Sequence, residues 1–336
     1  MKSLEDILQF LKKPRVPLVL GSMAAALFLP GPQAPTEEYV ELDPIVAEAP
    51  PVKKILDSQA KRYLDRARAE GLLKDDERVA IVGYDLLENE PLVNHNGDEL
   101  VQLASIVKIP VAAAYFHLVN EGELTYRTQS QDSLTQMLRN SHNEANNWFV
   151  RRMGGAEKVD SLLQEFYPNI FQDVHITDTI PTHWRVRGRE YKNRDTGQDL
   201  TTFQQELWKG NIPGHEEILG HMRNAKYKRL LENTSIIPEN DYSYEKTGST
   251  LGALGTTGIV VMNNGVQEHP YALTIIVERT RPVTQADRRG RNPKDWYDRT
   301  KQIVADLSDI VWLHANINYE LKRRKDHLSL SLPVKR

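Results

Sequence analysis

The sequence predicts an α/β sandwich of the α+β type, in which a five-stranded antiparallel sheet is packed by terminal helices and lies beside a helical lobe. Three observations predict this fold. The segments follow the order helix, two strands, helical block, three strands, helix. Short turns within each strand group favour hairpins, so neighbouring strands should run antiparallel. A chain of 336 residues, 40% of them hydrophobic, is long enough to bury one large core.

The compact region is predicted to open with a helix and a hairpin. Residues 52–71 carry apolar side chains at helical spacing and end at Gly71. Residues 78–86 and 91–95 read as strands, and Asn89 lies in the turn between them. These elements supply one terminal helix and the first two strands of the sheet.

A helical block follows the hairpin. Residues 105–120 form an apolar helix that ends at Gly122, and residues 131–150 and 156–167 also show helical patterns. From 168 to 196 the pattern gives way to Pro, Gly, Asn and charged residues, which predicts a long loop. Long loops in compact domains are often functional.

The C-terminal half is predicted to complete the sheet. Its elements are helical segments at 199–208 and 214–232, strands at 242–249, 255–263 and 271–279, and a final helix at 295–318. The two strand groups would meet in one sheet, and the helical block would form a second lobe. The cleft between sheet and lobe is therefore the natural place for a site.

The two ends of the chain are predicted to lie outside this domain, which we place at 52–318. Basic residues precede an apolar run at 17–30, so residues 1–30 resemble a signal sequence or signal anchor, with a buried core helix as the alternative. Proline and acidic residues make 31–51 an extended linker, and 319–336 is a basic tail. We expect an exported protein, periplasmic or anchored to the cytoplasmic membrane by residues 17–30 and facing outward.

Composition argues against several classes of protein. A net charge of −3 argues against a nucleic-acid partner. The absence of Cys excludes disulfides, thiolate zinc sites and Cys nucleophiles. The histidines lack paired ligand spacing, so we expect neither a metal nor a cofactor. We expect the domain to be monomeric.

Ser105-Ile-Val-Lys108 is the first of three short motifs that carry chemistry. On a helix, positions i and i+3 share a face, so the Lys108 amine can reach the Ser105 hydroxyl. A serine at a helix start also lies near unpaired backbone N–H groups that can stabilise an oxyanion. Two other serines precede a lysine at this spacing, Ser58 and Ser243, but only Ser105 heads an apolar helix.

Two further motifs follow along the chain. Ser141-His-Asn143 provides a hydroxyl that can pass a proton and an amide that can hold a substrate carbonyl or the lysine; a helix cap or turn is the alternative interpretation. Lys246-Thr-Gly248 ends a predicted strand, where a cation and a hydroxyl can bind a carboxylate; a plain strand end entering a turn is the alternative. Gly248 allows close backbone approach, and the next N–H, of Ser249, can be a second oxyanion donor.

The three motifs, in this order and on these elements, match those of β-lactamases and penicillin-binding proteins. Over about residues 52–318 the chain resembles class A β-lactamases and their D,D-peptidase relatives. The supporting sequences are Met153-Gly-Gly155, Arg194-Asp-Thr196 and Gly255-Thr-Thr-Gly258. The resemblance implies the same sheet-and-lobe fold and a serine acyl-enzyme.

The resemblance also implies a role for each motif residue. Ser105 attacks an amide carbonyl and Lys108 accepts its proton. Ser141 passes a proton to the leaving nitrogen, with Lys246 nearby. The remaining roles concern the substrate: Asn143 contacts its amide side chain, Thr247 and Ser249 bind its carboxylate, Gly248 lies between them, and the N–H groups of Ser105 and Ser249 form the oxyanion hole.

The largest departure from class A β-lactamases is in the long loop. Those enzymes carry a Glu-x-x-Leu-Asn motif whose glutamate activates the deacylating water, and no such motif occurs between 165 and 196. Glu190 is the nearest candidate, but its spacing is wrong and neighbouring arginines explain its charge. A positioned general base contributes ~10²–10⁴ in rate. Without one, a β-lactam acyl-enzyme should persist.

The leading hypothesis is a penicillin-recognising serine acyl-hydrolase that acts on D-Ala-D-Ala-type amides of peptidoglycan peptides through Ser105 and binds β-lactams with slow deacylation. A working class A-like β-lactamase is the first alternative. A non-catalytic cell-envelope binding module on the same fold is the second, since a fold alone does not prove activity.

Overall fold

The computed structural model describes residues 52–181, 193–263, 265, 267–289 and 292–331. The predicted signal segment and the linker lie outside these ranges, so both stay predictions.

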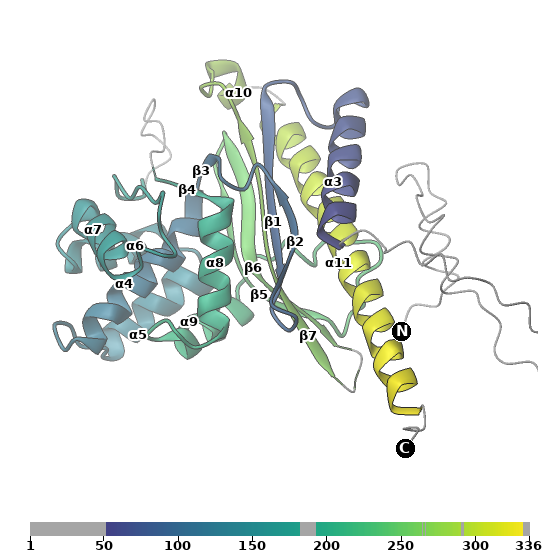
Figure 1. The fold of residues 1–336 in the computed structure, drawn as a ribbon. Coiled ribbons are helices and arrows are strands. Elements are labelled where there is room, and N and C mark those ends of the chain that lie inside the picture. Colours follow the sequence, from purple (N-terminus) through teal and green to yellow (C-terminus); the bar gives the residue numbers. More distant parts are fainter. Residues whose placement is uncertain (1–51, 182–192, 264, 266, 290–291, 332–336) are drawn as a thin grey trace, which may run out of the picture. The chain divides into compact units, whose positions relative to one another are not determined.

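A five-stranded antiparallel sheet, in the order β2-β1-β7-β6-β5, forms the centre of the fold (Figure 1). Its strands are β1 (Glu77–Asp85), β2 (Glu90–His95), β5 (Tyr242–Ser249), β6 (Ala253–Asn263) and β7 (Glu268–Arg279). The two strand groups meet where β1 pairs with β7, with Ala80 opposite Ile276. The predicted fold class and its hairpins are confirmed. Because β6 and β7 are buried along almost their whole length, the sheet needs cover on both faces.

Helices supply that cover (Figure 1). On one side, α3 (Val52–Ala69) and α11 (Asn292–Ser331) pack against each other and on the sheet. On the other side, α8 (Gly197–Trp208) packs on β1, β6 and β7, with the helical lobe beyond it. The α11 helix is longer than the predicted 295–318, because no Gly or Pro follows its first turn before Pro333.

The helical lobe is built around α4 (Lys108–Asn120), nearly all of whose side chains are buried. A helix that is apolar all round belongs in a core, which matches the predicted apolar helix at this place. The lobe also contains η1 (Ala104–Val107), α5 (Thr128–Leu134), the π-helical turn η2 (Thr135–Arg139), α6 (Asn143–Arg152), α7 (Ala156–Phe166) and α9 (His215–Arg223).

The predicted helix at 131–150 is interrupted, so that prediction was wrong. Ser141 has a φ of 58°, which is left-handed, and the His142 N–H donates to the Gln136 carbonyl at 2.8 Å. Serine and asparagine side chains compete with helical hydrogen bonds and favour turns. The Ser141-His-Asn143 motif therefore lies in a turn, and α6 begins at its asparagine.

The predicted helix at 214–232 ends early, at Arg223. Beyond it, the backbone N–H groups of Arg229 and Leu230 donate to the buried Glu245 carboxylate at 2.9 and 3.1 Å. A side chain of the sheet thus accepts the N–H groups that would bond to backbone carbonyls in a helix. The sequence of this segment alone does not reveal that partner.

Two short strands were not predicted. The strands β3 (Leu100–Gln102) and β4 (Arg194–Thr196) pair antiparallel, with Val101 opposite Asp195. Three residues are too few to show the period of two that marks a strand. Their pairing ties the end of the long loop to the strand that leads into Ser105.

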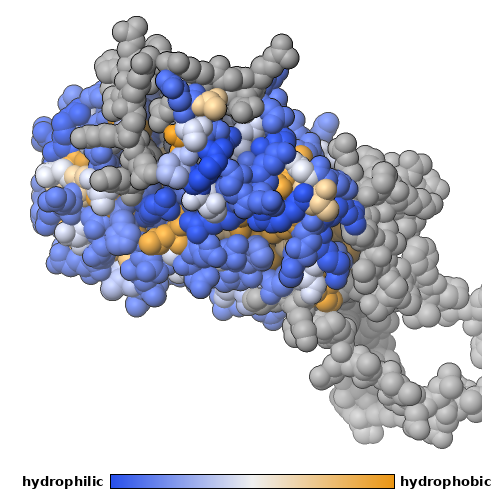
Figure 2. Space-filling view, turned by 90° about the horizontal axis from the view of Figure 1, so that it is seen from above, coloured by the Kyte–Doolittle hydropathy of each residue, from blue (hydrophilic) through white to orange (hydrophobic). Residues whose placement is uncertain are grey.

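One face of the described residues is mainly polar. Figure 2 shows hydrophilic residues over most of this face, with apolar residues in a few places on it. The exposed large apolar side chains are scattered singly, which is normal for a globular protein: Leu87, Phe166, Tyr227 and Leu251. None of the helices in the described ranges has both the length and the apolar content that a membrane crossing needs.

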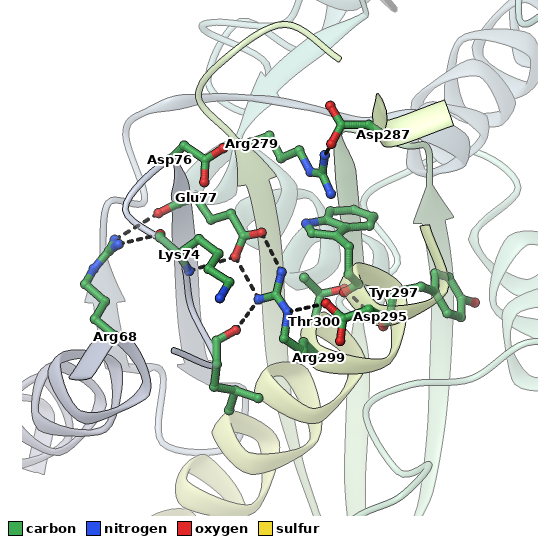
Figure 3. Close-up of polar contacts among 12 residues, drawn as sticks. Arg68, Lys74, Asp76, Glu77, Arg279, Asp287, Asp295, Tyr297, Arg299 and Thr300 are labelled. Carbon is green, nitrogen blue, oxygen red and sulfur yellow. Dashed lines mark hydrogen bonds and ion pairs between the residues drawn. The ribbon is translucent and has the colours of Figure 1, made fainter. Parts of the chain in front are cut away.

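A buried ion pair fastens the C-terminal helix to the sheet (Figure 3). Glu77, at the start of β1 and 2% exposed, accepts from Arg299 of α11 at 3.0 and 3.2 Å and from the Lys74 N–H at 2.9 Å. Arg299 also donates to the Leu72 carbonyl. Removing one partner of such a pair leaves the other charge uncompensated.

The substitution Glu77→Ala should therefore lower the free energy of unfolding by about 3 kcal/mol. The pair Lys61–Asp65, whose side chains are 66% and 62% exposed, offers a matched control. Asp65→Ala should change the same quantity by less than about 1 kcal/mol. Urea unfolding followed by circular dichroism measures both, and equal losses in the two variants would contradict this account of Glu77.

Candidate active site

The serine that precedes the α4 helix follows a residue whose backbone is left-handed. Ala104 has a φ of 49°, a conformation that non-glycine residues rarely adopt, and the half-buried Ser105 follows it in the 3₁₀ turn η1. A 3₁₀ turn aligns positions i and i+3. Lys108 Nζ accordingly lies 2.9 Å from Ser105 Oγ. The structure brings these two predicted residues into contact through a tighter turn than the α-helix that the sequence suggested.

The Lys108 amine is buried among serine and asparagine oxygens. The residue has no exposed surface, and its Nζ lies 2.6 Å from the Ser141 carbonyl oxygen, 3.2 Å from Ser141 Oγ and 2.8 Å from Asn143 Oδ1. Burial, followed by the positive charge of Lys246, lowers the pKa of Lys108 from 10.5 to about 6. At neutral pH the amine is mainly uncharged, and its lone pair can accept the proton of the Ser105 hydroxyl.

Ser141 lies between two amines. Lys246 of β5 is 2% exposed, and its Nζ donates to Ser141 Oγ at 2.9 Å. Burial and the charge of Arg229 lower the pKa of Lys246 to about 7, while Glu245 acts in the opposite direction. The Ser141 hydroxyl thus connects Lys108 with Lys246 and can pass a proton between them.

The end of β5 faces the η1 turn. Gly248 packs so closely that a Cβ there would lie 2.6 Å from the Leu103 carbonyl oxygen. The Thr250 N–H donates to the Ala253 carbonyl of β6, and hydrogen bonding alternates along an antiparallel edge strand. The N–H of Ser249 therefore points away from β6. The backbone N–H groups of Ser249 and of Ser105, near the start of η1, are thus two donors that can hold an oxyanion.

Arg229 is a residue of this site that the sequence did not reveal. It is 6% exposed, donates to the Gly248 carbonyl at 2.9 Å and places Nη2 3.4 Å from Ser249 Oγ. A buried positive charge thus lies behind the end of β5, at Gly248 and Ser249. This arrangement favours a carboxylate at the strand end. No motif marks Arg229, because its own segment fits a helical pattern.

Asparagine side chains hold the described part of the long loop. Asn147 accepts from the Ile180 N–H at 2.9 Å and donates to the Ile180 carbonyl at 2.7 Å. Asn143 Nδ2 donates to the Pro181 carbonyl at 3.0 Å. The Asn193 side chain bonds the backbone of residues 177–178. Asn143 therefore contacts the lysine through Oδ1 and the loop through Nδ2.

Other predicted residues do not join this arrangement. Glu190 lies outside the described residues and stays a prediction. Ser58 is exposed on α3, and Ser243 is buried in β5 beside Lys228 and Glu245. Within the described ranges, no group of three or more His, Cys, Asp or Glu side chains is placed to hold a metal ion.

The fold is that of serine hydrolases of the β-lactamase type. The chain belongs to the Beta-lactamase enzyme family, whose model matches residues 64–131 and 125–315. The resemblance seen in the sequence is thereby confirmed. No curated protein matches the chain.

Solved structures that resemble the chain include a penicillin-binding protein and β-lactamases. A variant of PBP-A, in an acyl-enzyme complex with penicillin G, is 19% identical, with a TM-score of 0.59 over 77% of this chain and 96% of that one. The TLA-1 extended-spectrum β-lactamase is 18% identical, with a TM-score of 0.59 over 78% and 99%. A β-lactamase from Chitinophaga pinensis is 16% identical, with a TM-score of 0.58 over 76% and 99%. At these identities the likeness shows a shared fold and does not decide between activities.

The substitution Asn147→Ala should lower the free energy of unfolding by about 2 kcal/mol, because both backbone groups of the buried Ile180 would lose their partner. Asn140 is exposed and its amide bonds the exposed Gln136, so Asn140→Ala is a matched control with an expected change within about 0.5 kcal/mol. Chemical denaturation compares the two. Indistinguishable stabilities would show that the loop does not depend on Asn147.

Proposed function

We propose that the protein is a penicillin-binding serine acyl-hydrolase that forms an acyl-enzyme at Ser105 and deacylates slowly. Its substrates would be D-Ala-D-Ala-type amides of peptidoglycan peptides. The observation that carries the proposal is the buried, mainly uncharged Lys108 amine 2.9 Å from Ser105 Oγ. Ser141 and Lys246 complete a path for a proton.

The acylation step follows from these contacts. The Lys108 amine takes the proton of the Ser105 hydroxyl while the serine oxygen attacks the amide carbonyl. The N–H groups of Ser105 and Ser249 stabilise the negative oxygen of the tetrahedral intermediate. Loss of one such donor typically costs about 2.7–4 kcal/mol of barrier.

The second half of acylation needs a proton for the leaving nitrogen. Ser141 Oγ gives its proton to that nitrogen and is replenished from Lys246, which lies 2.9 Å away. Thr247 and Ser249 bind the substrate carboxylate, with the positive charge of Arg229 behind them. Binding and proton transfer therefore use the same strand end.

The surroundings of Lys108 support slow deacylation. In the described part of the chain, each oxygen that bonds its amine belongs to a serine or an asparagine and none to a carboxylate. Among the described residues, then, no carboxylate at this amine can serve as the general base for a deacylating water, a role that contributes ~10²–10⁴ in rate. The structural likeness to a variant of PBP-A that was solved as an acyl-enzyme with penicillin G also supports this proposal.

A working β-lactamase is the alternative, supported by the likeness to TLA-1. It requires a water-activating group from the long loop, and Glu190 is the weak candidate there. A non-catalytic envelope binding module would have no need of a mainly uncharged Lys108 in contact with Ser105. We place the activity outside the cytoplasmic membrane, on the strength of the apolar segment at 17–30.

Incubation of the purified protein with benzylpenicillin should add the mass of one penicillin, in an adduct that outlasts the labelling reaction. Ser105→Ala should abolish the adduct, whereas Ser58→Ala, at the exposed serine of a second Ser-x-x-Lys sequence, should retain it. Intact-mass spectrometry over time measures both. A short-lived adduct with rapid penicillin hydrolysis would mean a β-lactamase, and no adduct would favour the binding module.

The acylation rate should rise with pH through about 6, because Lys108 must be uncharged to accept a proton and its pKa is about 6. It should fall above about 7, as Lys246 loses the proton that replenishes Ser141. The two amines interact, so the limbs of this profile belong to the pair. Fluorescent-penicillin labelling at a series of pH values gives the profile. A rising limb near 10, the ordinary lysine value, would show that Lys108 is charged at neutral pH.

A further inference from the structure

A buried carboxyl group in β4 lacks a donor for one of its oxygens. Asp195 has no exposed surface, and its carboxyl Oδ1 accepts the Thr196 N–H at 2.9 Å. Its Oδ2 is buried as well, and no N–H or O–H group of the described residues donates to it. An ionised carboxylate is unfavourable in such a place.

Among the described residues, no cation forms an ion pair with Asp195 or appears among the charges that act on it. The guanidinium of the neighbouring Arg194 bonds Glu278 at 3.2 Å. The charged groups that act most strongly on Asp195 are Asp199, from α8, and Asp173, from the loop, and both are acidic. The paired strand β3 carries no ionisable side chain.

Two other titratable groups lie on elements packed nearby. Asp160 of α7 accepts the Ile176 N–H at 2.5 Å. His175 pairs with Arg194 through the backbone and has an exposed side chain. Within the described ranges, the charges that act on Asp195 are therefore negative.

The carboxyl groups of Asp195 and Asp199 interact with each other, and both residues bond the Thr196 between them. Asp199 is 6% exposed, its Oδ2 accepts the Asp173 N–H at 2.9 Å, and its own N–H donates to Thr196 Oγ1 at 3.0 Å. Two carboxyl groups can bond to each other only through a proton. Burial, then the charge of Asp199, raises the pKa of Asp195 well above its ordinary value, and burial raises that of Asp199.

We propose that Asp195 and Asp199 share one proton, and that this acid–carboxylate pair positions Ser105. Asp195 is the acid and donates its proton. Asp199 is the carboxylate, and it accepts from Asp195 and from the Asp173 N–H. The pair fastens β4 and the loop segment to the first turn of α8.

One connection to the serine runs through the short sheet. Asp195 lies opposite Val101 in β3, and β3 leads into Ser105. Just after β3, the Leu103 N–H donates to the Asn193 carbonyl at 3.1 Å. A shift of β4 therefore shifts the turn that carries the serine.

A second connection runs through the loop segment 173–181. Asp199 holds one end of it, and Asn143 holds the other end while bonding the Lys108 amine. The pair thus lies at the far end of a hydrogen-bonded segment whose near end touches the lysine.

Rising pH should remove the proton of Asp195 and so weaken the link from β4 and the loop segment to α8. In the unfolded chain an aspartic acid loses its proton near about 4. In the folded protein Asp195 keeps its proton to higher pH, so the folded state binds more protons between those two values. The stabilisation is fully present below about pH 4 and is lost as pH rises through the raised folded-state pKa.

Infrared spectroscopy of the full-length protein at neutral pH tests the shared proton. The carbonyl band of a protonated carboxylic acid should be weaker in Asp195→Asn than in the wild type. Asp173→Asn, at an exposed aspartate whose N–H is kept, should leave the band unchanged. A band that is identical in the wild type and Asp195→Asn would overturn the proposal.

Variants with and without a donor test the positioning role. Asp195→Asn keeps a permanent N–H donor toward Asp199, so its penicillin acylation rate at pH 7 should stay close to that of the wild type. Asp195→Ala removes the donor and should slow acylation about 10- to 100-fold, as a misplaced nucleophile does. Equal rates in Asp195→Ala and the wild type would overturn the positioning role.

Unfolding measurements keep the proposal testable even if Asp195→Ala does not fold. The stability of the wild type should fall relative to Asp195→Asn as pH rises above about 4. Parallel curves would overturn the shared proton. The link to Ser105 rests on the proposed function, whereas the infrared and unfolding results do not involve it. A wild type that shows these signatures but no acylation would overturn the proposed function alone.

Discussion

The site depends on one buried amine that has oxygens around it and no carboxylate among its described partners. Lys108 is fully buried, and the oxygens that bond it belong to Ser105, Ser141 and Asn143. An unpaired ammonium is costly to bury, so the amine gives up its proton more readily. The irregular features of the lobe serve this arrangement: the left-handed Ala104 leads into the 3₁₀ turn that places Ser105 Oγ at the amine, and the left-handed Ser141 places its carbonyl oxygen there.

The second amine, that of Lys246, belongs to the sheet, whereas Lys108 belongs to the helical lobe. The arrangement therefore exists only where the lobe meets the sheet. Lys246 reaches Ser141 from the edge strand β5, and Gly248 lets that strand approach the Leu103 carbonyl. Behind the strand, Arg229 adds a positive charge that helps keep the Lys246 proton labile. The sheet therefore contributes charge as well as rigidity, while the terminal helices hold it in place from the other side.

Side chains, rather than regular secondary structure, hold the described part of the long loop. Buried backbone polar groups need partners, and an irregular segment cannot provide them to itself. Asn143, Asn147 and Asn193 provide them along one stretch, and Asp199 provides one at its start. Such a loop is fastened by a few individual bonds, so single substitutions or a change of protonation can affect it. A sheet or helix spreads the same task over many bonds.

The sequence by itself determined the order of elements, the antiparallel hairpins and the three motifs that meet in one site, because periodicity and short motifs are local properties of the chain. It left a turn at Ser141 as an alternative to a continuous helix, and it did not predict the segment in which Glu245 accepts from the backbone N–H of Arg229. It also could not show that the carboxyl groups of Asp195 and Asp199 interact. Only the tertiary structure decided these points, because each depends on a partner or on a burial that the local pattern does not contain.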